Sequence, residues 1–195
     1  MIIKDLSTVA KISVGDTVCM GKYPSGALGE VESISWSVIA EEEGRYLLVS
    51  KYCIDNLPFN YQHRAVIWER SDIREWLSYF FEDQFTEAER SCIVKTVCNN
   101  GQDKDTLDYV FLLSADEAKK YFKNDKARRC LATPYAEKRG AINIKNVKGT
   151  GWWLRSHGFG VSYASDVFPD GEISIDGEEV YEDGGIRPAM WLKLN

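Results

Sequence analysis

The sequence predicts a mixed α+β fold, with antiparallel strands towards both ends of the chain and short helices in the middle. Three observations predict it: strand-like apolar segments at both ends, helical spacing of apolar residues in the centre, and closely spaced turn signals in the last 45 residues. The chain has 195 residues, 44% of them hydrophobic, which is enough for one hydrophobic core. We expect a single domain over residues 1–195.

The first expected elements are strands. The segment 17–24, "TVCMGKYP", and the segment 33–54, "SISWSVIAEEEGRYLLVSKYCI", contain apolar and β-branched residues that alternate or cluster. The letters "EEEG" divide the second segment with a turn signal. Together these segments predict a hairpin or meander that opens the domain.

Two or three short helices are expected next. The segment 71–85, "SDIREWLSYFFEDQF", places four apolar residues at helical spacing, and Asp72 with Glu75 forms a candidate capping pair at its start. Two further helices are expected where Ser or Thr precedes Glu by three residues, which is capping-box spacing. Those pairs are Thr86 with Glu89 and Ser114 with Glu117.

The connecting segments have distinct compositions. Residues 99–108, "NNGQDKDTLD", predict a loop before an apolar strand at 109–113, "YVFLL". Residues 64–68 predict another strand, which places His63 just before it. Residues 123–150 are basic, polar and weakly periodic, with "TPYAEKRGA" as the clearest turn, so irregular structure is expected there.

The C-terminal part predicts tight hairpins in a loop-rich half of the molecule. The turn signals "PDG", "DGEE" and "EDGG" separate the short segments "YASDVF", "EISI" and "EEVY", and a final strand is expected at 187–194, "RPAMWLKL". From Gly151 onward, three basic residues stand against eight acidic ones. This region is therefore expected to be acidic and rich in exposed loops.

Composition disfavours several classes of protein. The net charge of −6 argues against nucleic acid as a partner, because phosphate binding needs a basic patch. The N-terminal letters "MIIKDLSTVAKISVGD" have no basic segment followed by a long apolar run, and no apolar stretch approaches membrane-spanning length, so we expect no membrane insertion and a cytoplasmic location by default. Five irregularly spaced cysteines indicate reduced thiols.

The sequence contains no recognisable catalytic or cofactor-binding motif. The chain has two histidines, His63 and His157, and lacks HxxxH, CxxC and CxxH spacings and phosphate-binding glycine loops. We therefore expect no enzyme activity, no cofactor and no transition-metal site. Acidic turns such as "DGEISIDGEE" offer oxygen ligands but match no EF-hand loop, so calcium remains open.

Two arginines and three tryptophans are expected to be structural. Arg155 and Arg187 lie beside strongly apolar segments, where a guanidinium that donates to carbonyls or a carboxylate can fix a loop-rich region. If "WWL" is a strand, its two tryptophans point to opposite faces, so one packs inside while the other covers a loop. The expected structural set is Trp152, Trp153, Arg155, Arg187 and Trp191.

An ordered series of motifs resembles a bacterial and phage domain family of uncharacterised function. The series runs from "GDTVCMGKYP" through "VIWERSDIREWL" and "DYVFLLSADEAKKYF" to "WWLRS" and "GGIRPAMWLKL", and so covers nearly the whole chain. Family members typically end in WWLRSPG and GVRPALWL. His157 stands where the family usually has proline, which leaves the path of the following loop open.

The same ending is similar to the C-type-lectin-like fold in its formylglycine-generating-enzyme variant. The enzyme's chemistry does not carry over, because its catalytic cysteines lie near the C-terminus and this chain has none after Cys130. Some proteins that look like this family are variable proteins of diversity-generating retroelements. Residues 156–171 contain no Lys, Glu, Gln, Met or Trp, which are residues that adenine mutagenesis of AAC codons cannot produce.

These resemblances imply a non-enzymatic ligand-binding protein whose candidate variable region is 156–185. Aromatic residues among Gly, Ser and Asp are typical of adaptable binding surfaces, and the alternative is that Phe159 and Phe168 pack beneath the loops. The implied partner is a protein or a cell-surface or phage ligand. The candidate ligand-binding residues are His157, Phe159, Val161, Ser162, Tyr163, Ser165, Phe168, Asp170, Ser174, Asp176, Tyr181 and Asp183.

The sequence is also compatible with two other functions. One is a metal-dependent enzyme of the formylglycine-generating-enzyme-like branch, with ligands assembled from His63, His157 and acidic residues distant in sequence. The other is a structural interaction module of a phage or bacterial assembly. Oligomeric state is left open, because exposed aromatic residues and edge strands permit self-association.

Overall fold

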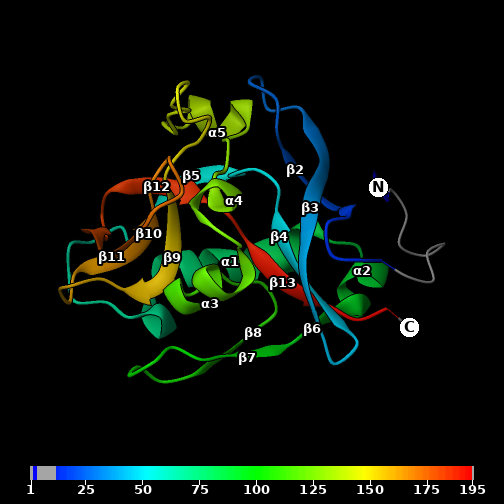
Figure 1. Ribbon diagram of the computed structural model, residues 1–195, viewed down its shortest axis with the longest axis horizontal. Coiled ribbons are helices and arrows are strands. Elements are labelled where there is room, and N and C mark those ends of the chain that lie inside the picture. Colours follow the sequence, from blue (N-terminus) through cyan, green and yellow to red (C-terminus); the bar gives the residue numbers. More distant parts are fainter. Residues whose placement is uncertain (1, 4–11, 195) are drawn as a thin grey trace.

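The computed structural model describes residues 2–3 and 12–194. Residues 1, 4–11 and 195 lie outside the described residues, and part of the N-terminal segment considered above falls on them. The expected α+β class is confirmed: strands form two large sheets and one two-stranded ribbon, and short helices lie among them (Figure 1).

The six-stranded sheet contains the expected N-terminal meander. Its order is β1-β2-β3-β4-β13-β6, and all its neighbours are antiparallel except β1 and β2. At the expected "EEEG" turn, Glu43 and Gly44 both have positive φ, at 52° and 72°, which is the geometry that tight hairpin turns use. The strands are β1 (Ile2–Ile3), β2 (Thr17–Pro24), β3 (Val31–Glu42), β4 (Arg45–Ser50), β6 (Ile93–Val94) and β13 (Ala189–Leu192).

The five-stranded sheet is built largely from the C-terminal hairpins. Its order is β11-β10-β9-β12-β5, with β12 parallel to β9 and the other pairs antiparallel. In the view of Figure 1 it lies to the left of the six-stranded sheet. The strands are β5 (Asp55–Pro58), β9 (Trp152–His157), β10 (Tyr163–Val167), β11 (Ile173–Glu179) and β12 (Asp183–Ile186).

The chain crosses between the two large sheets several times, and two of these passages adjoin: the one between β4 and β5 and the one between β12 and β13. Arg187 lies in the second passage and is buried. Its Nε donates to the Ser50 carbonyl at 3.1 Å and its Nη1 to the Arg128 carbonyl at 2.9 Å. Its guanidinium also lies 4.8 Å from the ring centroid of Trp152. One side chain thus joins the ends of both sheets.

The three expected helices are present, and their caps explain where they begin. Capping boxes form at Thr86 and at Ser114 as the spacing predicts. The first helix differs, because Ser71 and not Asp72 is the N-cap and accepts from the Arg74 amide. The helices are α1 (Asp72–Gln84), α2 (Glu87–Cys92) and α3 (Ala115–Tyr121).

Residues 123–150 contain two more helices than expected, α4 (Asp125–Arg128) and α5 (Pro134–Lys138). The N-cap Asn124 accepts from the Ala127 amide, and the N-cap Thr133 is followed by proline at the first helical position. Helices this short show no apolar periodicity, so the sequence pattern missed them. The "TPYAEKRGA" segment is therefore largely a helix.

Two expected strands are wrong. Residues 109–113 form only an isolated bridge between Phe111 and Ala189, and their apolar run reflects burial of Val110 to Leu113. The neighbouring "loop" instead contributes β8 (Thr106–Asp108), which pairs with β7 (Thr96–Cys98). The segment after His63 is irregular and leads into a 3-10 turn, η2 (Trp68–Arg70).

Candidate ligand-binding cleft

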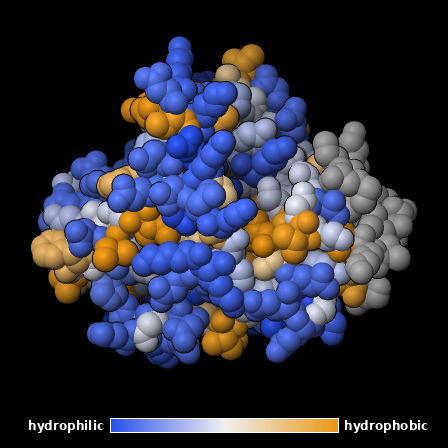
Figure 2. All heavy atoms as spheres, in the orientation of Figure 1, coloured by the Kyte–Doolittle hydropathy of each residue, from blue (hydrophilic) through white to orange (hydrophobic). Residues whose placement is uncertain are grey.

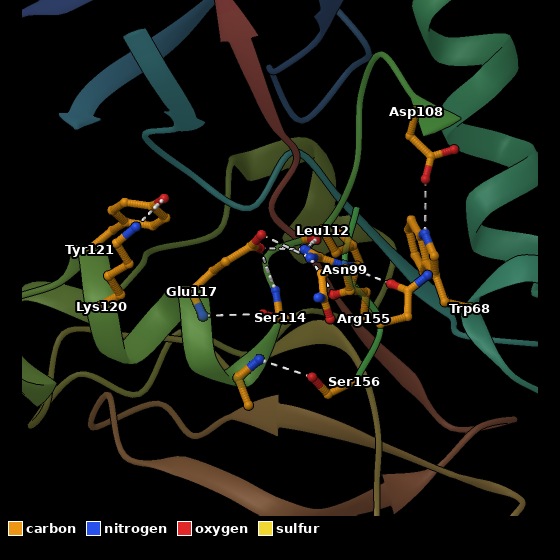
Figure 3. A network of polar contacts seen from close by, with 12 residues as sticks. Trp68, Asn99, Asp108, Leu112, Ser114, Glu117, Lys120, Tyr121, Arg155 and Ser156 are labelled. Atoms are coloured by element: carbon orange, nitrogen blue, oxygen red, sulfur yellow. Dashed lines mark hydrogen bonds and ion pairs between the residues drawn. The ribbon is translucent and has the colours of Figure 1, made fainter. Parts of the chain in front are cut away.

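Arg155 fixes β9 against the middle of the chain. Its guanidinium is buried and forms an ion pair with Glu117 at the start of α3. It also donates to the carbonyl oxygens of Leu112 at 2.8 Å and Asn99 at 3.0 Å (Figure 3). A further hydrogen bond runs to Oδ1 of Asn100 at 3.0 Å. These partners lie in the middle of the chain and not in the closing segment 184–194.

Both tryptophans that precede Arg155 are buried, so neither merely covers a loop. The Trp152 indole donates to the Arg128 carbonyl at 3.3 Å, and the Trp153 indole donates to the Leu57 carbonyl at 3.0 Å. A Cβ placed on Gly184 would lie 2.7 Å from Cε2 of Trp153, so only glycine fits there. The parallel contact of β9 with β12 depends on this close approach.

These strands form one wall of a cleft of about 650 Å³, and the segment 140–151 forms another. That volume lies within the range of small-molecule sites. Apolar and acidic side chains both contribute to the walls, and no Lys or Arg is among them. The lining residues are Asn56, Gly140, Ala141, Ile142, Ile144, Thr150, Gly151, Trp152, Trp153, Tyr163, Asp166, Pro169, Glu178, Glu179, Glu182, Asp183, Gly184 and Gly185.

Asp166 is the most unusual residue of the cleft. It lies on β10, an interior strand of the five-stranded sheet, opposite Trp153 of β9 and Ser174 of β11, with only 8% of its surface exposed. Its Oδ1 atom has no hydrogen-bond partner, and no other buried side-chain oxygen or nitrogen of the described residues shares this condition. Burial, and then the charge of Glu178, raise the pKa of Asp166 to about 7, against the lowering effect of a hydrogen bond from Ser174.

An irregular, bulge-like pairing precedes Asp166. The register of β10 shifts between Ala164 and Asp166, where residues 154–156 of β9 and 175–177 of β11 lie opposite the single residue Ser165. Irregularities of this kind redirect the side chains that follow them. Ser165 is buried, and its hydroxyl lies 3.0 Å from the His157 carbonyl and 3.2 Å from that of Ile175. Ser165 was expected to bind ligand, but its burial and these bonds make it part of the scaffold.

The other expected binding residues fall into separate groups. Tyr163 and Asp183 line the cleft. His157, Phe159 and Val161 line a second depression of about 490 Å³ together with residues 64–67. The remaining members, which line neither hollow, are Ser162, Phe168, Asp170, Ser174, Asp176 and Tyr181.

Phe159 does not pack beneath the loops, because 78% of its surface is exposed. Its ring centroid lies 5.6 Å from that of Tyr163, which lines the cleft. Phe168 is partly exposed, at 39%. Figure 2 shows hydrophobic side chains as separate patches on one face, among a largely hydrophilic surface.

The two histidines make local contacts. His63 packs edge-to-face against Tyr181, with ring centroids 5.0 Å apart, and Nδ1 of His157 lies 2.9 Å from the Gly158 carbonyl. Among the residues that the structure describes, no group of three or more His, Cys, Asp or Glu side chains is placed to hold a metal ion.

Sequence reasoning missed Asp166, Glu178 and the 140–151 wall. Asp166 is an acidic residue inside the apolar segment "YASDVF", which is a signal that it needs a partner or a function. The distant wall carries no such signal, because it meets β10 and β12 only in the folded chain.

Comparison with known proteins identifies the family. Searches of curated proteins and of solved structures found no significant match. Within residues 2–3 and 12–194, no helix has both the length and the apolar character needed to cross a membrane. One family model, described as a domain of unknown function (DUF6273), matches residues 43–194, which is more than three quarters of the chain. The chain therefore belongs to the DUF6273 family.

Proposed function

We propose that this domain is a non-enzymatic ligand-binding module and that its ligand occupies the cleft between residues 140–151 and the strands β10 to β12. The observation that carries the proposal is the buried Asp166 carboxylate, which lies in the wall of an open cleft with one oxygen unpartnered. Buried polar atoms nearly always have partners, so an unpaired oxygen on a residue that lines a cleft favours a ligand that brings a hydrogen-bond donor to it.

The arrangement of the walls supports recognition. Tyr163 and Asp166 lie on β10, Asp183 lies on β12, and both strands pair with β9. The indole of Trp153 on β9 is itself held by a hydrogen bond to the Leu57 carbonyl. A rigid frame of this kind limits the entropy lost on binding. Phe159, exposed beside Tyr163, adds an aromatic contact at the rim, which suits a protein or a cell-surface or phage ligand that inserts one group into the cleft.

A C-type-lectin-like scaffold with a retroelement-diversified surface is part of this proposal. Variation would be tolerated at exposed positions such as His157, Phe159 and Val161 and not at buried Ser165, so the diversified set is narrower than 156–185. A near-copy of the 3′ coding end beside a reverse transcriptase gene would support diversification. Without such a repeat, the surface is invariant and only the ligand-binding part of the proposal stands.

Binding in the cleft is tested with two matched variants. Ile142 lines the cleft and is 69% exposed, so Ile142→Trp narrows the cleft without disturbing the core. Ile175 is 59% exposed and lies outside the cleft, so Ile175→Trp adds the same indole elsewhere.

The measurement is a set of ¹H–¹⁵N chemical-shift titrations with a panel of capped tripeptides and small fragments of positive, negative and zero charge. We expect at least one compound to shift the amide signals of 163–167 and 182–185 in the parent and in Ile175→Trp, and not in Ile142→Trp. The proposal is overturned if no compound shifts these signals, or if Ile142→Trp responds like the parent.

A further inference from the structure

We propose that the cleft takes an organic cation, a protonated amine or a guanidinium, and holds it between Asp166 and Glu178. This inference rests on the proposed function, because it names the chemistry of the group that enters the same cleft. It assigns Asp166 as the residue that binds the cation directly and Glu178 as the second carboxylate.

The geometry brings both carboxylates to one place. Asp166 is opposite Ser174 on β11, and Glu178 lies further along β11, paired with Ala164. Both residues line the cleft, and the charge of Glu178 helps to raise the pKa of Asp166. Asp166 contributes an acceptor without a donor, and Glu178 is exposed and has no ion-pair partner among the described residues.

The surroundings leave a cation as the only favourable charged occupant. Three further acidic residues line the cleft: Glu179, Glu182 and Asp183. Glu179 accepts a hydrogen bond from the Tyr163 hydroxyl at 3.0 Å, which is a neutral partner. With no Lys or Arg in the lining, an anionic ligand would meet uncompensated repulsion, whereas a cation relieves both the burial and the repulsion at Asp166.

An organic cation fits better than a metal ion. The described residues contain no group of three or more metal-ligating side chains, and a cleft of about 650 Å³ is far larger than a bare ion needs. Ile142 and Ile144 supply exposed apolar surface in the same lining. An amine or guanidinium on a carbon stem uses both features, because its N–H groups reach the oxygens while its stem contacts the apolar wall.

The cation should displace a proton. Because the pKa of Asp166 is raised to about 7, part of the Asp166 population is neutral at pH 6 and most is ionised at pH 8. Binding therefore strengthens as the pH rises through 7. Five other titratable residues line the same cleft: Tyr163, Glu178, Glu179, Glu182 and Asp183. The four acidic residues among them add to the attraction of the cation.

The test is calorimetric titration of the whole chain with defined probes. The first is the capped peptide Ac-Ala-Arg-Ala-NH₂, and the second replaces Arg with citrulline, which keeps the shape and removes the charge. Spermidine serves as a free amine and CaCl₂ as a metal ion alone. We expect the arginine peptide or spermidine to bind at pH 8, the citrulline peptide to bind at least tenfold more weakly, and the affinity for the cation to fall severalfold at pH 6.

Variants assign the site. Asp166→Asn is isosteric and is expected to weaken binding of the cation at least tenfold and to abolish the pH dependence. Glu178→Gln, at an exposed position, is expected to weaken it severalfold. Asp83→Asn removes the same charge from an exposed position on α1 outside the cleft and is expected to leave binding unchanged.

The outcomes separate the two proposals. Binding by spermidine and not by the arginine peptide identifies a free amine as the source of the cation. Equal affinity for the arginine and citrulline peptides, or calcium binding that Asp166→Asn removes, overturns the organic cation. If uncharged fragments shift the cleft signals and cationic probes do not, the proposed function stands and this inference fails. If nothing shifts these signals, both fail.

Discussion

Asp166 shows how a single residue can be costly to the fold and useful to a site. Its carboxyl group lies on the interior strand β10 with one oxygen unpartnered, and the charge of Glu178 acts on it. An isolated buried charge lowers the stability of the folded state. A chain that keeps such a group in a cleft gains a place where an incoming cation is favoured over water.

The stability of the protein is expected to depend on this carboxyl group. The folded-state pKa of about 7 lies above the ordinary value of about 4, so the folded state holds the extra proton between these two pH values. The stabilisation of the folded state by this proton is fully present below about pH 4 and is lost as the pH rises through 7. The difference corresponds to at most about 4 kcal/mol of unfolding free energy.

Asp166→Asn removes this titration. We expect the variant to be more stable than the parent at pH 8, and the advantage to shrink towards pH 5, when both are unfolded in urea at the two pH values. Asp83→Asn is the control for loss of one negative charge. Equal stability of parent and Asp166→Asn at both pH values would show that Asp166 is not perturbed.

Arg155 is expected to dominate the stability of the middle of the chain. Replacing it with alanine leaves Glu117 without its buried partner and removes the donors to the Leu112 and Asn99 carbonyls. Loss of one member of a buried ion pair costs about 3–5 kcal/mol. Arg45→Ala, which breaks an ion pair with exposed Glu43, should cost less than about 1 kcal/mol. Urea unfolding of both variants checks this, and similar losses would contradict it.

At the scale of elements, β12 packs closely against β9 because Gly184 has no side chain. A side chain at Gly184 would strike the Trp153 indole, which is itself fixed by the Leu57 carbonyl. We expect Gly184→Ala to lower stability by about 1–3 kcal/mol through overpacking and to change the tryptophan fluorescence.

Gly151→Ala is the matched control for this position. Gly151 also lines the cleft, but a Cβ there would meet its nearest neighbour, the Val167 carbonyl, at an ordinary 3.5 Å. Thermal unfolding of the two variants should therefore differ clearly. Equal effects would mean that the strands have room to separate.

Elements with a local signal could be predicted from the sequence, and those held by distant contacts could not. The helices at Thr86 and Ser114 begin at capping boxes that can be seen in the sequence, and the "EEEG" hairpin carries its own turn. The apolar run 109–113 looked like a strand because continuous burial and strand pairing produce the same letters. The irregular pairing at Ser165 has no sequence signal.

The candidate site was predicted only in part for the same reason. The region 156–185 includes Tyr163, Asp166 and Asp183, but Asp166 was not singled out, because its environment is set by partners on β9 and β11. The wall that contains Ile142 lies in a segment expected to be irregular. Concavity is a property of the folded chain and has no local pattern.

Across the whole molecule, three of the five thiols are buried, and two of them, Cys53 and Cys130, lie near Arg187. Cys53 and Cys130 have their sulfur atoms 3.6 Å apart, and both are buried, as is Cys98. Burial raises the pKa of the Cys53 and Cys98 thiols, which keeps them in the unreactive form. Cys19 and Cys92 are partly accessible.

Thiol counting tests this packing. With an aromatic disulfide reagent at pH 8, the native protein should show two reactive thiols within minutes and all five in guanidinium chloride. Reaction of four or five thiols in the native protein would mean that the core around Arg187 opens readily. Three thiols in denaturant without reductant would indicate a disulfide between Cys53 and Cys130.

We propose that Asp166 is a buried carboxyl group that binds an organic cation. Carbon-detected NMR of the Asp166 side chain, followed from pH 3 to pH 9 with and without Ac-Ala-Arg-Ala-NH₂ or spermidine, tests it most directly. We expect a pKa near 7 in the free protein and a lower pKa when the cation is bound. A pKa near 4 in the free protein, or one that neither cation changes, would contradict it.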